Sequence, residues 1–284
     1  MSWRKYLLVP GLVVKGFGLP PRPQAAWERF WRAVRRTGPE GDVLWDGAGE
    51  SELDWWRATA AAYLDPSLPL VDVGCGNGRL SRLFAGTFPT VLGVDVAAAA
   101  VEVAERESPG TPSLSFRLLD VTAPDAAEAL LAEVGPANAV VRGVFHILSA
   151  PNRRRAADTL DRVLAGRGSL LLLETNWRGD LLGYLEYLGG HAGRLPAALG
   201  RLVENHVPRP SAFGPRELAE TFPASRWVTV TEGPVDIAPV HSLGPDAART
   251  IPGYHAVLRT RPAGTGTGSG TGTGIGTRTP EQGM

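Results

Sequence analysis

The chain contains almost no cysteine, and its histidines do not cluster with the one that is present. Cys75 is the single cysteine among 284 residues, so no disulfide can form within the chain. No combination of cysteine and histidine has the spacing of zinc ligands. A disulfide-stabilised scaffold and a structural zinc module are therefore excluded, and we expect no metal site.

The chain also lacks an excess of either charge and any long apolar run. Its 29 Lys and Arg residues balance 29 Asp and Glu residues, whereas a protein that coats nucleic acid usually carries a basic excess. No apolar run approaches the ~18 residues that a membrane-spanning helix needs. The apolar stretch 6–14 resembles a signal peptide only loosely, because no cleavage site of small residues follows it promptly. We expect a cytoplasmic protein that binds neither nucleic acid nor membrane.

Composition and periodicity divide the chain into four stretches. Residues 1–24 read as an extended leader, and residues 25–66 as an N-terminal helical cap in which Trp27, Phe30 and Trp31 share one helix face. Residues 67–262 hold the main domain. Residues 263–284 are mostly Gly and Thr with almost nothing to bury, and we expect a disordered tail.

Short apolar strands alternate with helices between residues 68 and 175. Strands are expected at 70–73, 90–96, 114–119, 137–144 and 169–174, and again at 227–231 and 254–260. This alternation predicts an α/β fold with a doubly wound, mostly parallel sheet and helices on both faces. The intervening residues 176–222 look helical. We interpret them as a lid on the carboxyl edge of the sheet, where ligands of open α/β sheets bind.

The first strand of the main domain runs into a cluster of glycines. Residues 71–80 read VDVGCGNGRL, so a strand ends in a tight turn that opens a helix. Glycine permits positive φ angles and has no Cβ, which lets a ligand approach the backbone closely. Alone, such a turn is a weak indication of nucleotide binding.

Acidic residues end the next two strands at the same edge. The second strand ends in Asp95, 17 residues beyond Gly78, and the third ends in Asp120. An acid at the end of the second strand can bind both ribose hydroxyls of a nucleoside. The glycine turn and the two acids, in this order and spacing, are a strong indication of a nucleoside site.

With these motifs, residues 68–175 resemble the class I S-adenosylmethionine-dependent methyltransferases of the small-molecule type. The resemblance implies a Rossmann-like, seven-stranded sheet whose last strand is antiparallel, and S-adenosylmethionine as cofactor. It also implies that Asp72 anchors the glycine loop near the methionine part, that Asp95 holds the ribose diol and that Asp120 accepts from the adenine amino group. The cofactor contacts expected on this basis are Asp72, Gly74, Cys75, Gly76, Gly78, Asp95, Val96, Asp120, Val121 and Arg142.

A dinucleotide-dependent oxidoreductase is the main alternative among nucleotide-binding proteins. Its fingerprint is G-x-G-x-x-G, whereas the third glycine comes one position early here. Three aspartates around one site, Asp72, Asp95 and Asp120, repel a pyrophosphate and attract a sulfonium and an ammonium group. The residues therefore favour a methyl donor over a dinucleotide.

Two residues are candidates for catalysis, His146 after the fourth strand and Glu174 at the end of the fifth. A histidine, with an ordinary pKa of about 6.5, suits a general base, and packing beside the cofactor is its alternative role. Glu174 is expected to point toward the pocket, with a solvent-facing strand end as its alternative role. The Asn/Asp-Pro-Pro-aromatic motif of nucleobase amino methyltransferases is absent here.

Aromatic residues outside the alternating region are candidate contacts to an organic acceptor. Trp177, Tyr184 and His191 form this predicted set. Tyr184, Tyr187 and His191 fall at i, i+3 and i+7, a spacing that ordinary amphipathic helix packing also predicts. Trp45 is expected either to cap the donor site or to pack in the core. The run Asn152 to Arg155 is explained by a helix capped by Asn152 with exposed arginines, rather than by a nucleic-acid contact.

These residues lead to the expectation of methyl transfer to an oxygen or nitrogen of a small organic acceptor, by in-line displacement in a closed pocket. Two alternatives stay open. One is a methyltransferase that acts on RNA or protein, and the other is a protein that binds S-adenosylmethionine without transferring the methyl group.

Overall fold

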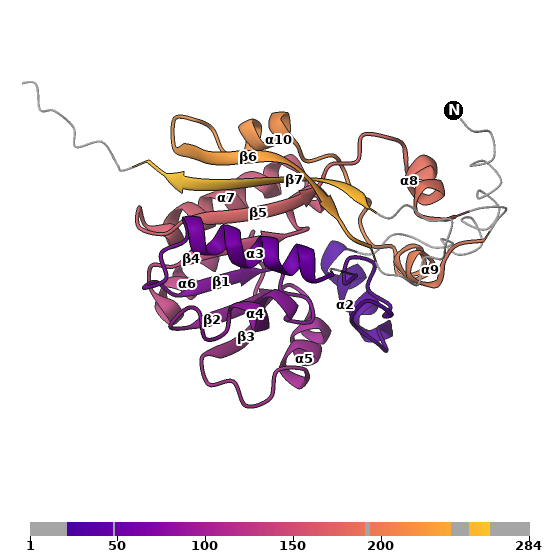
Figure 1. Ribbon diagram of the computed structural model, residues 1–284, viewed down its shortest axis with the longest axis horizontal. Coiled ribbons are helices and arrows are strands. Elements are labelled where there is room, and N and C mark those ends of the chain that lie inside the picture. Colours follow the sequence, from indigo (N-terminus) through magenta and orange to yellow (C-terminus); the bar gives the residue numbers. More distant parts are fainter. Residues whose placement is uncertain (1–21, 48, 191–193, 240–249, 262–284) are drawn as a thin grey trace, which may run out of the picture.

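The computed structural model describes residues 22–47, 49–190, 194–239 and 250–261 (Figure 1). The predicted tail 263–284, most of the predicted leader and His191 lie outside the described residues. In the described part of the chain, no helix is both long and apolar enough to cross a membrane.

A single seven-stranded sheet, in the order β3-β2-β1-β4-β5-β7-β6, forms the centre of the molecule. Five strands run parallel, and β7 is antiparallel to both of its neighbours, β5 and β6. The predicted sheet and its antiparallel last strand are therefore confirmed. The strands are β1 (Leu70–Val73), β2 (Val91–Asp95), β3 (Leu114–Leu118), β4 (Asn138–Arg142), β5 (Leu170–Thr175), β6 (Trp227–Ile237) and β7 (Ile251–Thr260).

Successive residues of the central strands serve two separate cores, because side chains alternate between the faces of a sheet. Leu70 packs with Trp56 of α3 (Glu50–Tyr63), which lies across one face in Figure 1. Val71 packs with Leu160 of α7 (Ala150–Leu164) on the other face. The central strands are buried on both faces, which explains their unbroken apolar runs.

The remaining helices of the alternating region flank these two. Helix α4 (Arg79–Phe84) joins α3 on its face through Leu80 and Phe84. Helix α6 (Ala126–Val134) joins α7 through Leu130. Helix α5 (Ala98–Arg106) packs against α2 (Pro23–Ala33), whose Phe30 and Trp31 are buried. The predicted helices on both faces of the sheet are confirmed.

The helical insertion before the last two strands divides into two parts. Helices α8 (Leu181–Tyr187) and α9 (Ala197–Glu204) lie with α2 near the carboxyl ends of the parallel strands (Figure 1). Helix α10 (Pro215–Thr221) instead belongs to the core, because its Leu218 and the following Phe222 pack with the cluster around α7. Of the predicted lid 176–222, α10 is therefore part of the core, and α8 and α9 are the helices that lie near those carboxyl ends.

The start of α7 differs from the prediction. Ser149, not Asn152, is the residue before the helix, and Pro151 occupies its first turn, where a missing N–H costs nothing. Arg153 is 9% exposed, contrary to the prediction of an exposed face. Its guanidinium donates to the Phe145 carbonyl at 2.8 Å and to Ser211 Oγ at 2.6 Å, so it anchors the turn after β4.

Candidate functional site

A cavity of about 370 Å³ opens at the carboxyl ends of the parallel strands, and we call it the edge cavity. Two smaller cavities adjoin it: the loop cavity of about 40 Å³ and the side cavity of about 80 Å³. Trp45 and Arg142 line all three. Of the predicted cofactor contacts, those that line the edge cavity are Gly74, Gly76, Asp95, Val96, Asp120, Val121 and Arg142.

The glycine loop lies beneath helix α2. Gly76 has a φ of +55°, and a Cβ built on it would stand 2.8 Å from Cζ2 of Trp31. Gly78, with a φ of +75°, lines none of the three cavities, and a Cβ there would meet Phe116 Cζ at 2.6 Å. Gly76 thus allows an indole to close over the loop, whereas Gly78 serves packing.

Asp95 joins the end of β2 to this loop. Its Oδ2 accepts from the Gly76 amide at 3.0 Å and its Oδ1 accepts from the Ala97 amide at 3.0 Å. The side chain is 8% exposed, and that exposed fraction faces the edge cavity. Burial raises the pKa of Asp95 to about 6, against the opposing effect of the backbone hydrogen bonds.

Asp72 lies under the loop and lines the loop cavity together with Cys75. Ser81 Oγ donates to its Oδ2 at 2.6 Å. Burial, together with the like charge of Asp95, raises the pKa of Asp72 to about 6, against the opposing effect of the Ser81 hydrogen bond. A cation bound between these two carboxyls would favour their ionised forms.

Asp120 lies at the other end of the edge cavity. Its Oδ1 accepts from the backbone and hydroxyl of Thr122, at 2.8 Å and 2.7 Å. Its Oδ2 accepts from Nε2 of Gln24 on α2 at 3.1 Å. A side-chain amide therefore occupies the position at which the resemblance predicts the adenine amino group, and the sequence offered no indication of this pairing.

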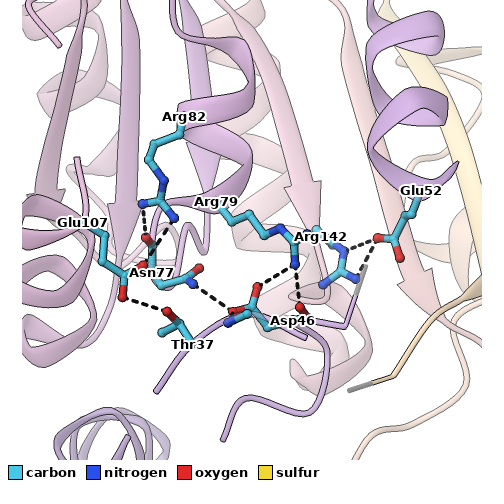
Figure 2. A network of polar contacts seen from close by, with 9 residues as sticks. Thr37, Asp46, Glu52, Asn77, Arg79, Arg82, Glu107 and Arg142 are labelled. Carbon is cyan, nitrogen blue, oxygen red and sulfur yellow. Dashed lines mark hydrogen bonds and ion pairs between the residues drawn. The ribbon is translucent and has the colours of Figure 1, made fainter. Parts of the chain in front are cut away.

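Arg142, at the end of β4, is paired with an acid that sequence reasoning missed. Its Nε donates to Oε1 of Glu52 on α3 at 2.8 Å, and Nη2 lies 2.7 Å from the same oxygen (Figure 2). Both side chains are largely buried. Oε2 of Glu52 is also buried and has no hydrogen-bond partner. Glu52 lies 90 residues before Arg142, so no local pattern could indicate the pair.

Residues 34–47, which we call the strap, are tied to the glycine loop by Asp46. Asn77 Nδ2 donates to its Oδ2 at 3.0 Å, and Arg79 donates to its carbonyl and to its Oδ1 (Figure 2). Further along, Thr37 donates to Glu107 at 2.9 Å. These contacts hold Trp45 against the three cavities. The sequence left open whether Trp45 packs in the core or caps the site, and in the structure its ring packs against Trp27 and Phe30 while also lining the three cavities.

His146 and Glu174 are brought together by the short 3₁₀ helix η2 (Phe145–Ile147). His146 Nδ1 lies 2.7 Å from Glu174 Oε2. The carboxylate also accepts from the backbone amides of Val144, Phe145 and His146, at 3.0, 2.9 and 3.1 Å. Glu174 has no exposed surface and lines none of the three cavities, so the structure places it beneath the turn instead of pointing toward the pocket.

The imidazole itself lines the side cavity. An ionised carboxylate can only accept, so Nδ1 carries the hydrogen and Nε2 of a neutral ring is left as an acceptor. The ring edge at Cε1 lies 3.5 Å from the Cβ position of Gly143, and Gly143 lines both the edge and the side cavity. His146 therefore stands where the two cavities meet.

The predicted acceptor contacts separate in the structure. Tyr184 lines the side cavity, and burial raises the pKa of its hydroxyl. Trp177 lines none of the three cavities and packs against Tyr184 and Tyr187, with ring centroids 5.4 and 4.9 Å apart. Trp177 thus supports the wall of the cavity without forming it.

Gly76→Ala should destabilise the fold more than an alanine elsewhere at positive φ. The backbone cost is about 1–2 kcal/mol, and displacing the buried Trp31 ring adds about 1–3 kcal/mol. Gly86→Ala is the matched control, because Gly86 has a φ of +86° and nothing within 4 Å of its Cβ position. Urea unfolding of both variants measures the difference. An equal decrease in the free energy of unfolding in both variants would show that the Trp31 ring can move aside at no energetic cost.

The comparisons with known proteins agree with this geometry. Residues 70–168 match the family model described as a methyltransferase domain. A solved S-adenosylmethionine-dependent methyltransferase from Anabaena variabilis is 28% identical, covers 87% of this chain and 98% of its own, and superposes with a TM-score of 0.73. The N-methyltransferase NodS from Bradyrhizobium japonicum in complex with S-adenosylhomocysteine is 14% identical, covers 83% and 98% of the two chains, and has a TM-score of 0.52, which shows the fold alone.

The doubly wound sheet with acids at its carboxyl edge defines a nucleoside-binding α/β protein. Together with the methyltransferase domain matched over residues 70–168, it makes this chain similar to the class I S-adenosylmethionine-dependent methyltransferases, and the cofactor is S-adenosylmethionine. A curated relative, EEF1A lysine methyltransferase 4 of Mus musculus, is 32% identical over 150 residues, which are 51% of this chain and 55% of that protein. The chain thus spans about half the length of this relative.

Proposed function

We propose that the protein transfers a methyl group from S-adenosylmethionine to an oxygen or nitrogen of a small organic acceptor. The observation that carries the proposal is that Trp45 and Arg142 line all three cavities, which places the cavities next to one another. A long ligand can extend from the glycine loop to Asp120, and a second ligand can reach its middle from the side cavity.

The residues at the edge and loop cavities fit the donor. The backbone of Gly74 and Gly76, which have no Cβ, lines both the edge cavity and the loop cavity. In the loop cavity the buried Oε2 of Glu52 has no partner, which suits a ligand with an ammonium group. Asp72 and Asp95 add negative charge at a site from which water is largely excluded, and this favours a cationic ligand over a pyrophosphate.

When bound, S-adenosylmethionine supplies an electrophilic methyl group on a sulfonium. The chain's own residues bind and orient. Asp95 would hold the ribose diol, and Arg142 would lie near the methionine carboxylate. Asp120 would accept from the adenine amino group once the hydrogen bond from Gln24 to its Oδ2 is broken. Alignment of two ligands in a closed site is the main source of rate for such a displacement.

A small acceptor is supported by what surrounds the side cavity. Its walls come from α2, the strap, β5, α8, α9 and the last two strands, so it is enclosed from many sides. The curated relative is by its name a lysine methyltransferase, which makes a protein acceptor the second candidate. A lysine side chain needs an acceptor for its positive charge, and no carboxylate is found among the described residues that line this cavity.

Calorimetry with the purified protein tests the donor half of the proposal, and release of S-adenosylhomocysteine tests the transfer. We expect S-adenosylmethionine and S-adenosylhomocysteine to bind and NAD to give no heat. A mixture of small hydroxylated and aminated aromatic compounds should release S-adenosylhomocysteine above the rate without acceptor. Binding of NAD, or release only with a protein substrate, would contradict the proposal.

A further inference from the structure

We propose that the side cavity takes a compact, uncharged acceptor with an apolar body and one phenolic hydroxyl, which it presents to Nε2 of His146. This inference rests on the proposed function and names the class of its acceptor. It is drawn from the charge of the cavity wall, from the chemistry of its polar groups and from the support of His146.

The cavity wall carries no uncompensated charge. Among the described residues that line it, Arg142 is the one with a charged side chain, and Glu52 matches that charge at 2.7 Å. An anionic acceptor would therefore find a guanidinium that is already paired. A cationic acceptor would meet that guanidinium with no lining carboxylate, and burying an unpaired charge is costly.

Most of the wall is apolar. Leucines and isoleucines from five different segments line it together with the two indoles of Trp27 and Trp45, namely Leu44, Leu173, Leu202, Ile237 and Ile251. Such a wall binds an apolar body through the surface that leaves water, at about 25 cal/mol per Å². The indole and leucine surfaces suit a single ring, since the cavity measures only about 80 Å³.

The polar groups of the cavity converge on one function. His146 stands beside Gly143, where the side and edge cavities meet, and Tyr184 offers a hydroxyl from α8. The turn that carries His146 is held from both sides. On one side, the Glu174 carboxylate accepts hydrogen bonds from the three backbone amides of the turn. On the other side, Ser211 donates to the His146 carbonyl through its amide at 2.9 Å and its hydroxyl at 2.6 Å.

An imidazole so placed is matched to a hydroxyl of moderate acidity. A general base works best when the proton it removes is not held too tightly, which admits a phenol with a pKa of about 10 and excludes an aliphatic alcohol. The phenolic proton passes to Nε2 of His146. An oxygen electron pair forms the new O–CH₃ bond while the S–CH₃ electrons remain on sulfur, and the imidazolium then releases its proton to water.

A matched set of four single-ring compounds tests the class. p-Cresol has the proposed features, 4-hydroxybenzoate adds a carboxylate, tyramine adds an ammonium group, and benzyl alcohol replaces the phenol by an aliphatic hydroxyl. Binding to the protein saturated with S-adenosylhomocysteine is followed by quenching of tryptophan fluorescence, and turnover by formation of S-adenosylhomocysteine from S-adenosylmethionine. We expect p-cresol to bind at least tenfold more tightly than the two charged phenols, and benzyl alcohol to bind without turnover.

The His146→Gln variant distinguishes the role of His146 as a general base from its role as part of the cavity wall. We expect p-cresol to bind within about twofold of its original affinity, and turnover at pH 7 to fall by about 10²–10⁴, the usual contribution of a general base. The residual rate should rise with pH as free phenolate forms, a signature that a merely structural role would not give. His206→Asn is the control, because His206 lines none of the three cavities and Asn tolerates its φ of +54°, and it should keep the pH profile of the original protein.

Each outcome bears on one proposal. If S-adenosylmethionine does not bind, the proposed function fails. If it binds and p-cresol neither binds nor reacts, or if tyramine or 4-hydroxybenzoate is preferred, the inference about the acceptor is overturned and the proposed function stands. Unchanged turnover in His146→Gln would also overturn the role given to His146.

Discussion

Glu174→Ala is expected to lower the free energy of unfolding by about 3–5 kcal/mol, the cost of removing one partner from a fully buried charged network. The variant leaves three backbone amides and His146 Nδ1 without their acceptor. For a protein of this size, such a loss corresponds to a decrease of Tm by roughly 10 °C. Urea unfolding and thermal scans followed by circular dichroism measure both quantities.

Glu220→Ala is the matched control for this substitution. Glu220 is exposed and bonds only the neighbouring Arg216 on the same helix in the contacts described, at 2.9 Å. Removing such a surface pair changes stability by less than about 1 kcal/mol. If Glu174→Ala cost no more than this control, the turn after β4 would be held by Ser211 and Arg153 alone.

The second large effect is expected at the donor site. Asp95→Ala should weaken binding of S-adenosylmethionine by about 1.5–3 kcal/mol, which is roughly a tenfold to hundredfold rise in Kd. The substitution removes the proposed ribose contact and the acceptor of the Gly76 amide. Because the ribose is common to both ligands, the affinity for S-adenosylhomocysteine should fall by the same factor. Calorimetry with both ligands checks this, and unchanged affinities would refute the assignment.

Asp95→Asn separates binding from stability. The pKa of Asp95 is raised to about 6 from an ordinary 3.8, so its protonated form is favoured in the folded state. Its contribution to stability is thus fully present below about pH 4 and is lost as the pH rises through 6. At pH 7.5 the uncharged amide carries no such cost, but its NH2 group cannot accept from one of the two backbone amides that Asp95 binds. We therefore expect the two effects to offset and the free energy of unfolding to change by less than about 1 kcal/mol. Weaker donor binding in a protein of nearly unchanged stability would assign the effect to the site.

The framework of the fold could be predicted because its signals are local. The apolar run at 70–73 and the glycines after it mark a strand and a turn by themselves, and β1 has the predicted bounds. Asp95 and Asp120 were identifiable as candidate ligands since parallel strands bring their carboxyl ends to one edge. The boundary after β4 was placed too late, because the apolar residues 143–145 continue the strand pattern while the backbone turns at Gly143, with a φ of +77°.

The residues that close the site could not be predicted in this way. Gln24 meets Asp120 from 96 residues away, and Asp46 meets Asn77 from 31 residues away. Trp45 and Trp56 look alike in the sequence, yet Trp45 lines the cavities and Trp56 is buried against the sheet. Such pairings depend on the course of the strap over the glycine loop, which no pattern of neighbouring residues records.

The amino-acid order alone determined the α/β class and the expected methyl donor. These follow from properties of short segments, namely strand and helix periods, glycine positions and acids at strand ends. Tertiary structure decided which way the side chains turn and what they meet. Glu174 lies near the end of β5, one residue before Thr175, but η2 folds over it, so a residue predicted to face the pocket is instead the buried support of His146. Contacts of this kind depend on segments packed in three dimensions, and packing is a property of the whole chain.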